Sequence, residues 1–503
     1  MSFVSLASRR RAELLAVIAA LIFIPLLYLH QSWIPEAAVS HLYPKPGEDL
    51  AHGPDGNSSP LFAPELACRH LPGAEDVLVI LKTGSTVSHK KLPIHFNTTF
   101  RCIPHWIVFS DLEEDVAGHH VHDVLDEIDD SVKNTAAEFH LYHQIQEWHA
   151  EEITPTAINE TLRKQAWDLD KWKFLPLVKK ALRTRPEAKW YFFMEADSFL
   201  MWSNLLLYLS QLNTDESLYL GWSIHSFIHS FVFCVHYLFT SFLLPLSHIA
   251  ALYQQLTTRS GAQAWISDTE FAHGGSGFVI SNRALRTVVE EYTARVSYYN
   301  ELTRNEWAGD GVLAKAMKNR GIHLTRAFPI VQGETPYTLD YTERHWCYPV
   351  VSYHHMSPEW IQTMWDYEQE WLAKEQANTT TLDSSLSEPI RHRHVFAHFV
   401  QSTISSGEKT AWDNLSPDLS ADGETTLEMC RDICKAADSC VQWLFTAPGD
   451  CKIANVVRLG SRPTDEDAVK YTSGWMADRV AAFVDKMGLC RSDWIMPNAG
   501  AVA

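Results

Sequence analysis

The sequence lacks an excess of positive charge. Its 503 residues include 42 lysines and arginines against 61 aspartates and glutamates, which gives a formal net charge of −19. A protein that binds nucleic acid needs a basic surface to neutralise the phosphates. The composition therefore argues against nucleic acid as the main partner, and surface solvation accounts for the acidic excess.

The sequence also has few cysteines, and no two of them have the C-x-x-C spacing that is typical of zinc modules. Of the nine that are present, four gather near the C-terminus, at Cys430, Cys434, Cys440 and Cys451. This cluster favours a small module held by disulfides, and it predicts an oxidising compartment. The spacing alone does not show which of these cysteines are bonded to each other.

A nearly uninterrupted apolar run extends over 14–29 and follows Arg9–Arg11. With its flanks it approaches the roughly 20 residues that cross a bilayer. The arginines predict a cytosolic tail over 1–11, a membrane anchor over 12–30 and a lumenal remainder. A cleaved signal peptide is the alternative, but no small-x-small cleavage site directly follows the run. Five Asn-x-Ser/Thr triplets, the first at Asn57, fit a lumenal location.

The segment 31–70 is rich in proline and glycine and predicts a flexible stem. Three short apolar runs after it predict buried strands, over 76–81, 105–109 and 190–194. Helical periodicity lies between them, most clearly over 169–182. Strands that alternate with helices predict an α/β domain over 71–400 with a mainly parallel sheet. Ligands of such sheets bind beyond the carboxyl ends of the strands, and polar residues follow all three.

One stretch has no charged side chain at all, from 222 to 258. A second membrane span over 231–244 is one interpretation, but it would return the C-terminal cysteines to the cytosol. A buried insertion is another. We favour a segment, 222–264, that is translated from an unspliced intron, because its removal also removes Cys234 and leaves an even number of cysteines. Sequencing the transcript across this segment tests the hypothesis.

Two carboxylates with one spacer, Glu195 and Asp197, follow the third predicted strand. Side chains of an extended segment alternate between its two sides, so both carboxylates point the same way. Carboxylate oxygens are the ligands that hard divalent cations prefer. The pair therefore predicts a Mn²⁺ or Mg²⁺ site, with a solvated loop as the alternative.

Three further groups are candidates for the same site. The stretch 271–281 has three glycines in four positions, among them Gly274 and Gly275, and permits close approach of the backbone to a ligand. A tight turn is the alternative there. Asp310 stands near the start of a predicted helix, either as an N-terminal cap or as a functional carboxylate. His354 is a candidate metal ligand or a structural histidine.

Taken in order, these groups resemble the β1,3-glycosyltransferase family that includes the Fringe proteins and core 1 galactosyltransferase (glycosyltransferase family 31), and its fungal members most closely. The matching stretches are 167–176, 189–199, 271–281 and 353–359. The resemblance implies a GT-A fold, a Mn²⁺ (or Mg²⁺) ion and a UDP-sugar donor. It also implies a glycan or glycoprotein acceptor, inversion at the anomeric carbon and a Golgi location as a single-pass type II membrane protein.

The resemblance implies roles for single residues by position. Asp197 and His354 match the family's metal ligands, and Asp310 matches the base that acts on the acceptor hydroxyl. The positions implied for donor binding are Thr83, Asp111, Lys171, Glu195, Gly274 and Gly275. Glu195 stands where the family usually has Asp, and Gly309 where it often has a second acidic residue. These two departures keep open an alternative, a carbohydrate-binding scaffold without turnover. The C-terminal segment 410–503 resembles PAN/apple-type modules.

Overall fold

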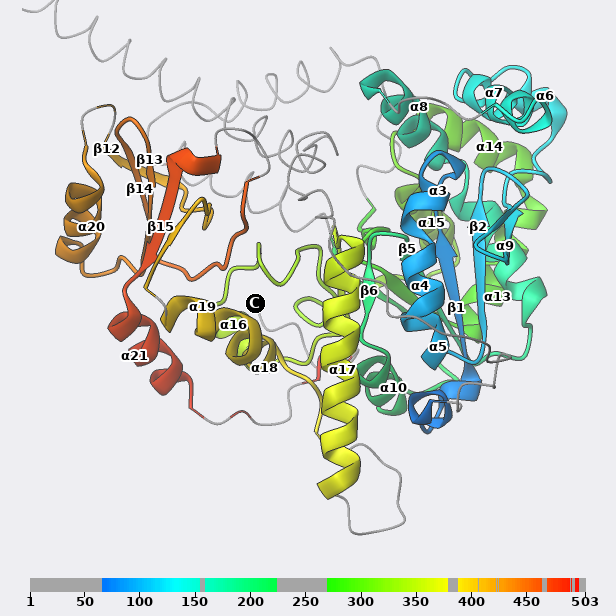
Figure 1. Ribbon diagram of the computed structural model, residues 1–503. Coiled ribbons are helices and arrows are strands. Elements are labelled where there is room, and N and C mark those ends of the chain that lie inside the picture. Colours follow the sequence, from blue (N-terminus) through cyan, green and yellow to red (C-terminus); the bar gives the residue numbers. More distant parts are fainter. Residues whose placement is uncertain are drawn as a thin grey trace, which may run out of the picture. The chain divides into compact units, whose positions relative to one another are not determined.

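The computed structural model describes most of the chain beyond the predicted stem (Figure 1). The described residues are 66–153, 159–223, 269–378, 388–405, 407–421, 423, 425–463, 468–488, 490 and 494–496. The predicted tail and anchor, nearly all of the stem and all but two residues of 222–264 lie outside them. Within these ranges, no helix has both the length and the apolar character that a membrane crossing requires.

The described residues form two compact units. The larger comprises Gly56–Ser406, Val456–Leu459 and Ala477–Ala503, and the smaller comprises Gly407–Asn455 and Gly460–Met476.

An eight-stranded sheet in the order β3-β4-β2-β1-β5-β8-β7-β9 is the centre of the larger unit. Its strands are β1 (Val77–Lys82), β2 (Trp106–Ser110), β3 (Glu114–Val116), β4 (His119–Asp123), β5 (Trp190–Glu195), β7 (Tyr219–Gly221), β8 (Phe278–Ser281) and β9 (Leu324–Arg326). The three strands predicted from apolar runs, β1, β2 and β5, are confirmed within one residue at each end.

The sheet is mixed, whereas the sequence predicted a mainly parallel one. The neighbours β4, β2, β1 and β5 are parallel, as are β7 and β9. The pairs β3–β4, β5–β8 and β7–β8 are antiparallel. Because β8 runs against β5 and Phe278 lies opposite Phe193, the glycine-rich loop before β8 is placed at the carboxyl end of β5. The antiparallel strand thus adds a loop to the edge where ligands of parallel sheets bind.

Helices cover both faces of this sheet (Figure 1). Alternation along β1, whose residues are all buried, sends Leu78 and Ile80 into one apolar core and Val77, Val79 and Leu81 into the other. The longer helices of the first core are α7 (Phe139–Ala150), α8 (Glu160–Asp170), α9 (Phe174–Thr184), α13 (Asn282–Ala294), α14 (Val296–Asn305) and α15 (Gly309–Asn319). Helices of the second are α4 (Pro93–Asn97), α5 (Thr99–Cys102), α10 (Trp202–Ser210) and α17 (Pro358–Asn378).

Most of the remaining elements of the larger unit are short. They are η1 (Ala67–His70), η2 (Ala74–Asp76), α3 (Ser85–Lys91), α6 (Asp130–Lys133), β6 (Phe199–Leu200), α16 (Glu343–Trp346), β10 (Ser352–Tyr353), α18 (His392–Val395), η3 (Phe396–Val400), α19 (Gln401–Ser405) and the longer α21 (Ala477–Met487). Strands β6 and β10 pair antiparallel as a separate ribbon.

One predicted helix is interrupted in the structure. The stretch 169–182 was expected as a single helix, but α8 ends at Asp170 and α9 begins at Phe174. The interruption brings Lys173 to the sheet edge, where its ammonium contacts a buried carboxylate. The ion pair between Lys173 and Asp111 joins residues that are far apart in the sequence. Local hydrophobic periodicity therefore could not predict the break between α8 and α9.

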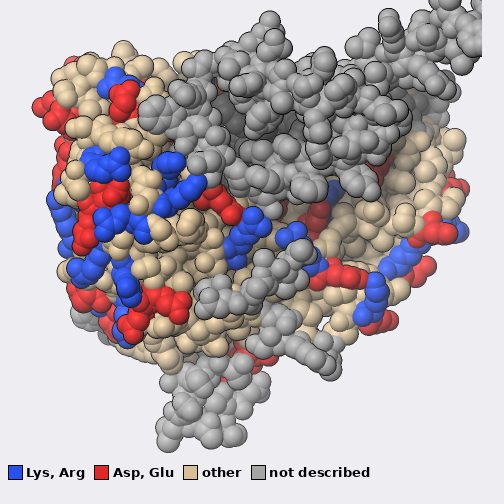
Figure 2. All heavy atoms as spheres, turned by 180° about the vertical axis from the view of Figure 1, so that it is seen from behind, with Lys and Arg blue, Asp and Glu red and all other residues tan. Residues whose placement is uncertain are grey.

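Basic and acidic side chains of the larger unit form many close pairs. Lys179 contacts Glu127 at 2.8 Å, and Lys180 contacts Asp126 at 2.7 Å. On the face that Figure 2 shows, lysines and arginines likewise lie among aspartates and glutamates. Such exposed pairs contribute little stability individually and mainly set the surface character.

The described residues of the smaller unit form a five-stranded antiparallel sheet, one α-helix and a short 3-10 helix. The sheet has the order β11-β15-β13-β14-β12. Its elements are β11 (Glu408–Thr410), β12 (Asp418–Ala421), α20 (Leu427–Ala436), β13 (Gln442–Thr446), β14 (Asp450–Ala454), η4 (Ala468–Lys470) and β15 (Tyr471–Trp475). Its buried cluster consists of Trp443 and the four cysteines predicted to staple this region.

Eight cysteines form four disulfides. The pairs are Cys68–Cys102, Cys347–Cys490, Cys430–Cys451 and Cys434–Cys440. The last two confirm the predicted disulfide-held cluster and supply the pairing that spacing left open. Every cysteine outside 222–264 is therefore paired, while Cys234 lies outside the described residues.

The disulfide between Cys68 and Cys102 allows a first prediction. Replacing both cysteines by alanine should lower the free energy of unfolding of the larger unit by about 3 kcal/mol, because the bond closes a long loop. The sequence separation is 34, and both residues are buried. Denaturant unfolding of the wild type and the double variant measures the change, and identical midpoints would contradict it.

Candidate metal and donor site

The carboxyl ends of β1, β2 and β5 meet at one edge of the eight-stranded sheet. β1 lies between the other two strands, and its registers place Lys82 beside Phe109 on one side and beside Glu195 on the other. The candidate residues that end or follow these strands therefore lie at one edge, namely Thr83, Asp111, Glu195 and Asp197.

Asp111 is held by a buried lysine. Lys173 Nζ lies 2.8 Å from Asp111 Oδ2, and the two side chains are 2% and 1% exposed. The backbone N–H of Ser85 donates to Asp111 Oδ1 at 2.8 Å, and Lys173 also donates to the carbonyl oxygen of Thr83 at 2.8 Å. Burial alone would raise the pKa of Asp111, but Lys173 and the hydrogen bonds from Ser85 together outweigh it and the net pKa is lowered. These contacts fix an ionised carboxylate where the nucleotide was predicted to bind.

Glu195 is paired with Lys82. The ammonium lies 3.0 Å from Glu195 Oε1 and also contacts Asp170 at the end of α8. Burial would lower the pKa of Lys82, but Asp170 and Glu195 outweigh it, so the lysine stays charged. Sequence reasoning missed the roles of Lys82, Asp170 and Lys173. Asp170 and Lys173 lie within the motif stretch 167–176, which could have indicated their role.

Asp197 lies with two histidines that follow β10. One ligand atom each of Asp197, His354 and His355 lies within 4.8 Å of the others. His354 Nε2 is 3.5 Å from Asp197 Oδ1, and the backbone N–H of Met356 donates to the carbonyl oxygen of Asp197 at 2.7 Å. His355 has a left-handed backbone (φ 57°), which turns the chain at this point. His355 was not predicted as a ligand, although it adjoins one that was.

These three residues fit a divalent cation. Carboxylate oxygen and imidazole nitrogen are both ligands of Mn²⁺ and related metals. Among the described residues, His354 Nδ1 is a buried nitrogen without a hydrogen-bond partner, which is unusual for a polar atom in a protein interior. The cluster accordingly has the donor set that the predicted metal site requires.

The electrostatics of the cluster favour an ionised Asp197. Burial would raise its pKa, but Lys91, whose Nζ lies 3.3 Å from Oδ2, and His354 outweigh burial and hold it well below its usual range. Conversely, burial lowers the pKa of His354, and Asp197 outweighs this effect and raises it. Asp197 is thus available as an anionic ligand at neutral pH.

The glycine-rich loop packs directly on this cluster. A Cβ atom on Gly275 would lie 2.3 Å from His354 Cε1 and Nε2. A Cβ on Gly274 would lie 2.9 Å from Phe174 Cζ and 3.4 Å from Glu195 Oε1. The glycines therefore permit a close approach, here to the side chains of the protein itself.

Replacing Gly275 by alanine should reduce metal-dependent activity by about 100-fold, because the new methyl group must displace the His354 imidazole. Gly321→Ala is the matched control, since its Cβ would meet no atom within 4 Å while its backbone is left-handed (φ 73°). The control should lose stability without losing activity. Parallel measurements of melting temperature and turnover check both, and equal activities in the two variants would contradict the prediction.

Asp310 lies next to this loop, at the second residue of α15. Its Oδ2 accepts from the N–H of Gly274 at 3.0 Å, and its Oδ1 accepts from the N–H of Gly311 at 2.9 Å. The N-cap of α15 is Ala308, so the alternative that Asp310 caps the helix is wrong. Burial raises its pKa to about 7, although the two backbone N–H groups oppose the shift. A carboxylate with this pKa can exchange a proton near neutral pH.

Lys171 is engaged away from the sheet edge. Its Nζ lies 2.7 Å from Glu138 Oε1 and donates to the carbonyl oxygens of Arg304 and Glu306 at 3.2 and 3.1 Å. These contacts hold the segment that leads into α15. A Cβ on Gly309 would lie 2.3 Å from the Lys171 carbonyl oxygen, which explains in steric terms why no acidic side chain occupies that position.

Comparison with known proteins identifies a matching family. The family model described as Fringe-like matches residues 73–331, slightly more than half of the chain. The matched region includes the strand-end residues, the glycine-rich loop and Asp310, and it ends before His354. No curated protein matches the sequence.

Proposed function

Because the chain belongs to the Fringe-like family of glycosyltransferases, we propose that it is an inverting, divalent-metal-dependent enzyme of this kind. It transfers a hexose from a UDP-sugar to a hydroxyl of a glycan or glycoprotein, in a β1,3 linkage. The observation that carries the proposal is the buried Asp310, with a pKa of about 7, hydrogen-bonded to the loop that packs on His354.

The mechanism is a single displacement. Asp310 accepts the proton of the acceptor hydroxyl as its oxygen attacks the anomeric carbon, while the bond from that carbon to the UDP oxygen breaks. Asp197, His354 and His355 would hold a Mn²⁺ or Mg²⁺ ion, which when bound supplies positive charge for the diphosphate leaving group. Lys173 holds Asp111 in its ionised form beside the nucleotide position.

Two exposed tryptophans support a sugar acceptor. The rings of Trp167 and Trp307 stack at 6.4 Å between centroids, and these residues are 44% and 53% exposed. Trp307 precedes Asp310 by three residues and also contacts the ring of Phe271. Exposed aromatic faces next to a base offer an apolar surface for one side of a sugar ring.

Replacing Trp307 by alanine should therefore raise the acceptor KM about tenfold and leave the donor KM unchanged, since the ring is expected to contact only the acceptor. Trp307→Phe, which keeps an aromatic face, serves as the matched variant. Its acceptor KM should lie between those of the wild type and the alanine variant. Steady-state kinetics with each substrate varied in turn measure this. A rise confined to the donor KM would overturn the assignment.

The proposed function is tested by UDP release from a panel of UDP-sugars, with and without EDTA and with Mn²⁺ restored. Metal-dependent release from one donor supports the enzyme and identifies the sugar. The pairing of Glu195 with Lys82 favours one competing function, a carbohydrate-binding scaffold that keeps the fold without turnover. Sugar binding with no release from any donor would establish that alternative.

We also propose a cellular setting. Residues 12–30 anchor the chain in the Golgi membrane as a single-pass type II protein, with 31–70 as the stem and the catalytic domain in the lumen. Four disulfides support an oxidising compartment. The smaller unit is proposed as a PAN/apple-like binding module of a fungal enzyme, on the basis of its cysteine-centred core. Protease protection of the lumenal part in sealed vesicles tests the topology.

A further inference from the structure

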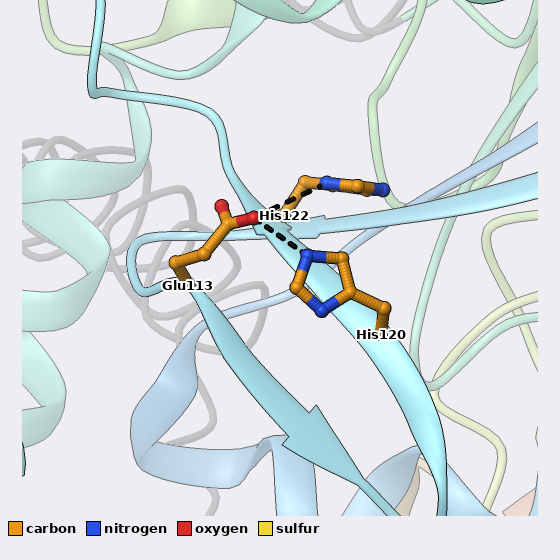
Figure 3. Close-up of side chains that lie close together, drawn as sticks. All are labelled: Glu113, His120 and His122. Atoms are coloured by element: carbon orange, nitrogen blue, oxygen red, sulfur yellow. Dashed lines mark hydrogen bonds and ion pairs between the residues drawn. The ribbon is translucent and has the colours of Figure 1, made fainter.

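A second cluster of metal-ligand side chains lies on the hairpin formed by β3 and β4. Glu113 precedes β3, and His120 and His122 belong to β4 (Figure 3). One ligand atom from each lies within 4.8 Å of the other two. We propose that Glu113, His120 and His122 form a second metal site, which takes Zn²⁺ or a chemically similar transition-metal ion.

The hairpin brings these residues together through its strand geometry. His120 and His122 are alternate residues of β4 and so project from the same face. Their rings lie 4.5 Å apart between centroids. Glu113 Oε1 lies 2.6 Å from His120 Nε2 and 3.4 Å from His122 Nδ1, and Figure 3 shows this one oxygen directed at both rings.

Hydrogen bonds outside the cluster orient two of the three ligands. His120 Nδ1 lies 3.0 Å from Asp115 Oδ1, so Asp115 accepts the proton of this ring nitrogen. Nε2 donates to Glu113 Oε1 at 2.6 Å, and a bound metal ion would take the place of that proton. The backbone N–H of Asp123 donates to Glu113 Oε2 at 2.7 Å, which leaves Oε1 as the ligand atom. A carboxylate behind a ligating histidine is a regular feature of zinc sites, where it fixes the tautomer and the ring orientation.

The donor set selects the metal. Two imidazoles and one carboxylate suit Zn²⁺, whereas Mg²⁺ and Ca²⁺ prefer oxygen alone. Ligand atoms around a tetrahedral zinc ion lie about 3.4 Å apart, since each is about 2.0–2.1 Å from the metal. The separation of Glu113 Oε1 and His122 Nδ1 already has this value. The side chains are 54%, 49% and 38% exposed for Glu113, His120 and His122, so His120 can move back without disturbing the core and a fourth position stays open to solvent.

The site is separate from the proposed catalytic centre. In the sheet order, β4 is three strands away from β5, which corresponds to about 14 Å between strands. β3 is a three-residue strand at the edge of the sheet, and a metal ion shared by Glu113 and the β4 histidines would tie this edge to its neighbour. The inference does not depend on the proposed function.

The test uses the full chain carrying Asp197→Ala, which removes a ligand of the proposed catalytic cluster. Zn²⁺ titration by calorimetry, and Co²⁺ titration followed by visible absorption, should show one equivalent bound. His120→Gln with His122→Gln should weaken binding at least 100-fold and remove the Co²⁺ bands. Asp115→Asn, which keeps all three ligands, should weaken it by about 10- to 100-fold.

The matched control replaces two exposed histidines of α7, His140 and His149, by glutamine. It should bind Zn²⁺ as the parent does. If the His120/His122 variant does not fold, as judged by circular dichroism, Glu113→Gln supplies the same test and should weaken binding at least tenfold. Unchanged Zn²⁺ affinity and stoichiometry in the folded ligand variant would overturn the proposal, as would equal losses in the control.

Discussion

Replacing Asp197 by alanine is expected to abolish UDP release from every UDP-sugar, with turnover lowered at least about 1000-fold. Asp197 contributes the carboxylate of the cluster with His354 and His355, and its pKa is held well below its usual range by Lys91 and His354. Without it, the two imidazoles keep no anionic partner to hold a hard divalent cation. Turnover at saturating donor and a Mn²⁺ titration, followed by electron paramagnetic resonance, measure the two effects together.

A carboxylate on the surface of the same unit provides the control. Asp168 lies on α8 and pairs with Lys164 one helical turn away, at 2.7 Å. Asp168→Ala should bind Mn²⁺ and release UDP as the wild type does. Full activity in Asp197→Ala, with unchanged Mn²⁺ affinity, would remove Asp197 from the metal site.

Replacing Asp310 by asparagine should lower kcat by about 100- to 10,000-fold while Mn²⁺ and UDP binding stay within about twofold of the wild type. Asparagine has the shape of Asp310 but cannot accept the proton of the acceptor hydroxyl. The asparagine variant should lose proton transfer and keep donor binding, so it separates the two functions. Asp197→Ala does not separate them. Full kcat in the asparagine variant would exclude Asp310 as the base.

The pH dependence of the wild type follows from the same residue. Burial raises the pKa of Asp310 from 3.8 to about 7, so the base is protonated and inactive below this pH and becomes active above it. The raised pKa also means that Asp310 favours the folded state at low pH, and that this contribution is lost as the pH rises through about 7. Asp310→Asn should therefore lose the acidic limb of the rate profile, and with it the part of the pH dependence of stability that lies between 3.8 and about 7.

The sequence predicted those parts of the site that follow from local pattern. The strand before Glu195 and the glycines before β8 were visible as an apolar run and a cluster of small residues, and the family match covers both. The mixed character of the sheet was not visible, because strand direction depends on how β8 returns beside β5.

The ion pairs of the site could not be predicted in the same way. Lys82 meets Asp170 across 88 positions of the chain, and Lys173 meets Asp111, which follows a different strand. Such contacts depend on where α8 ends. The helical periodicity of the sequence continues through that point, so it did not predict the end of the helix. His355 was likewise missed because its left-handed backbone is a property of the folded turn.

The ion pairs at the sheet edge affect how the proposed metal and nucleotide would bind together. Lys82 and Lys173 contact Asp111, Asp170 and Glu195 there, and Lys91 and His354 contact Asp197. Around Lys82 and Lys173, three carboxylates against two ammonium groups leave one surplus negative charge, which would oppose the entry of the proposed UDP-sugar diphosphate. A divalent cation at the proposed metal site would offset that charge. The proposed metal and nucleotide would then strengthen each other's affinity by the same factor.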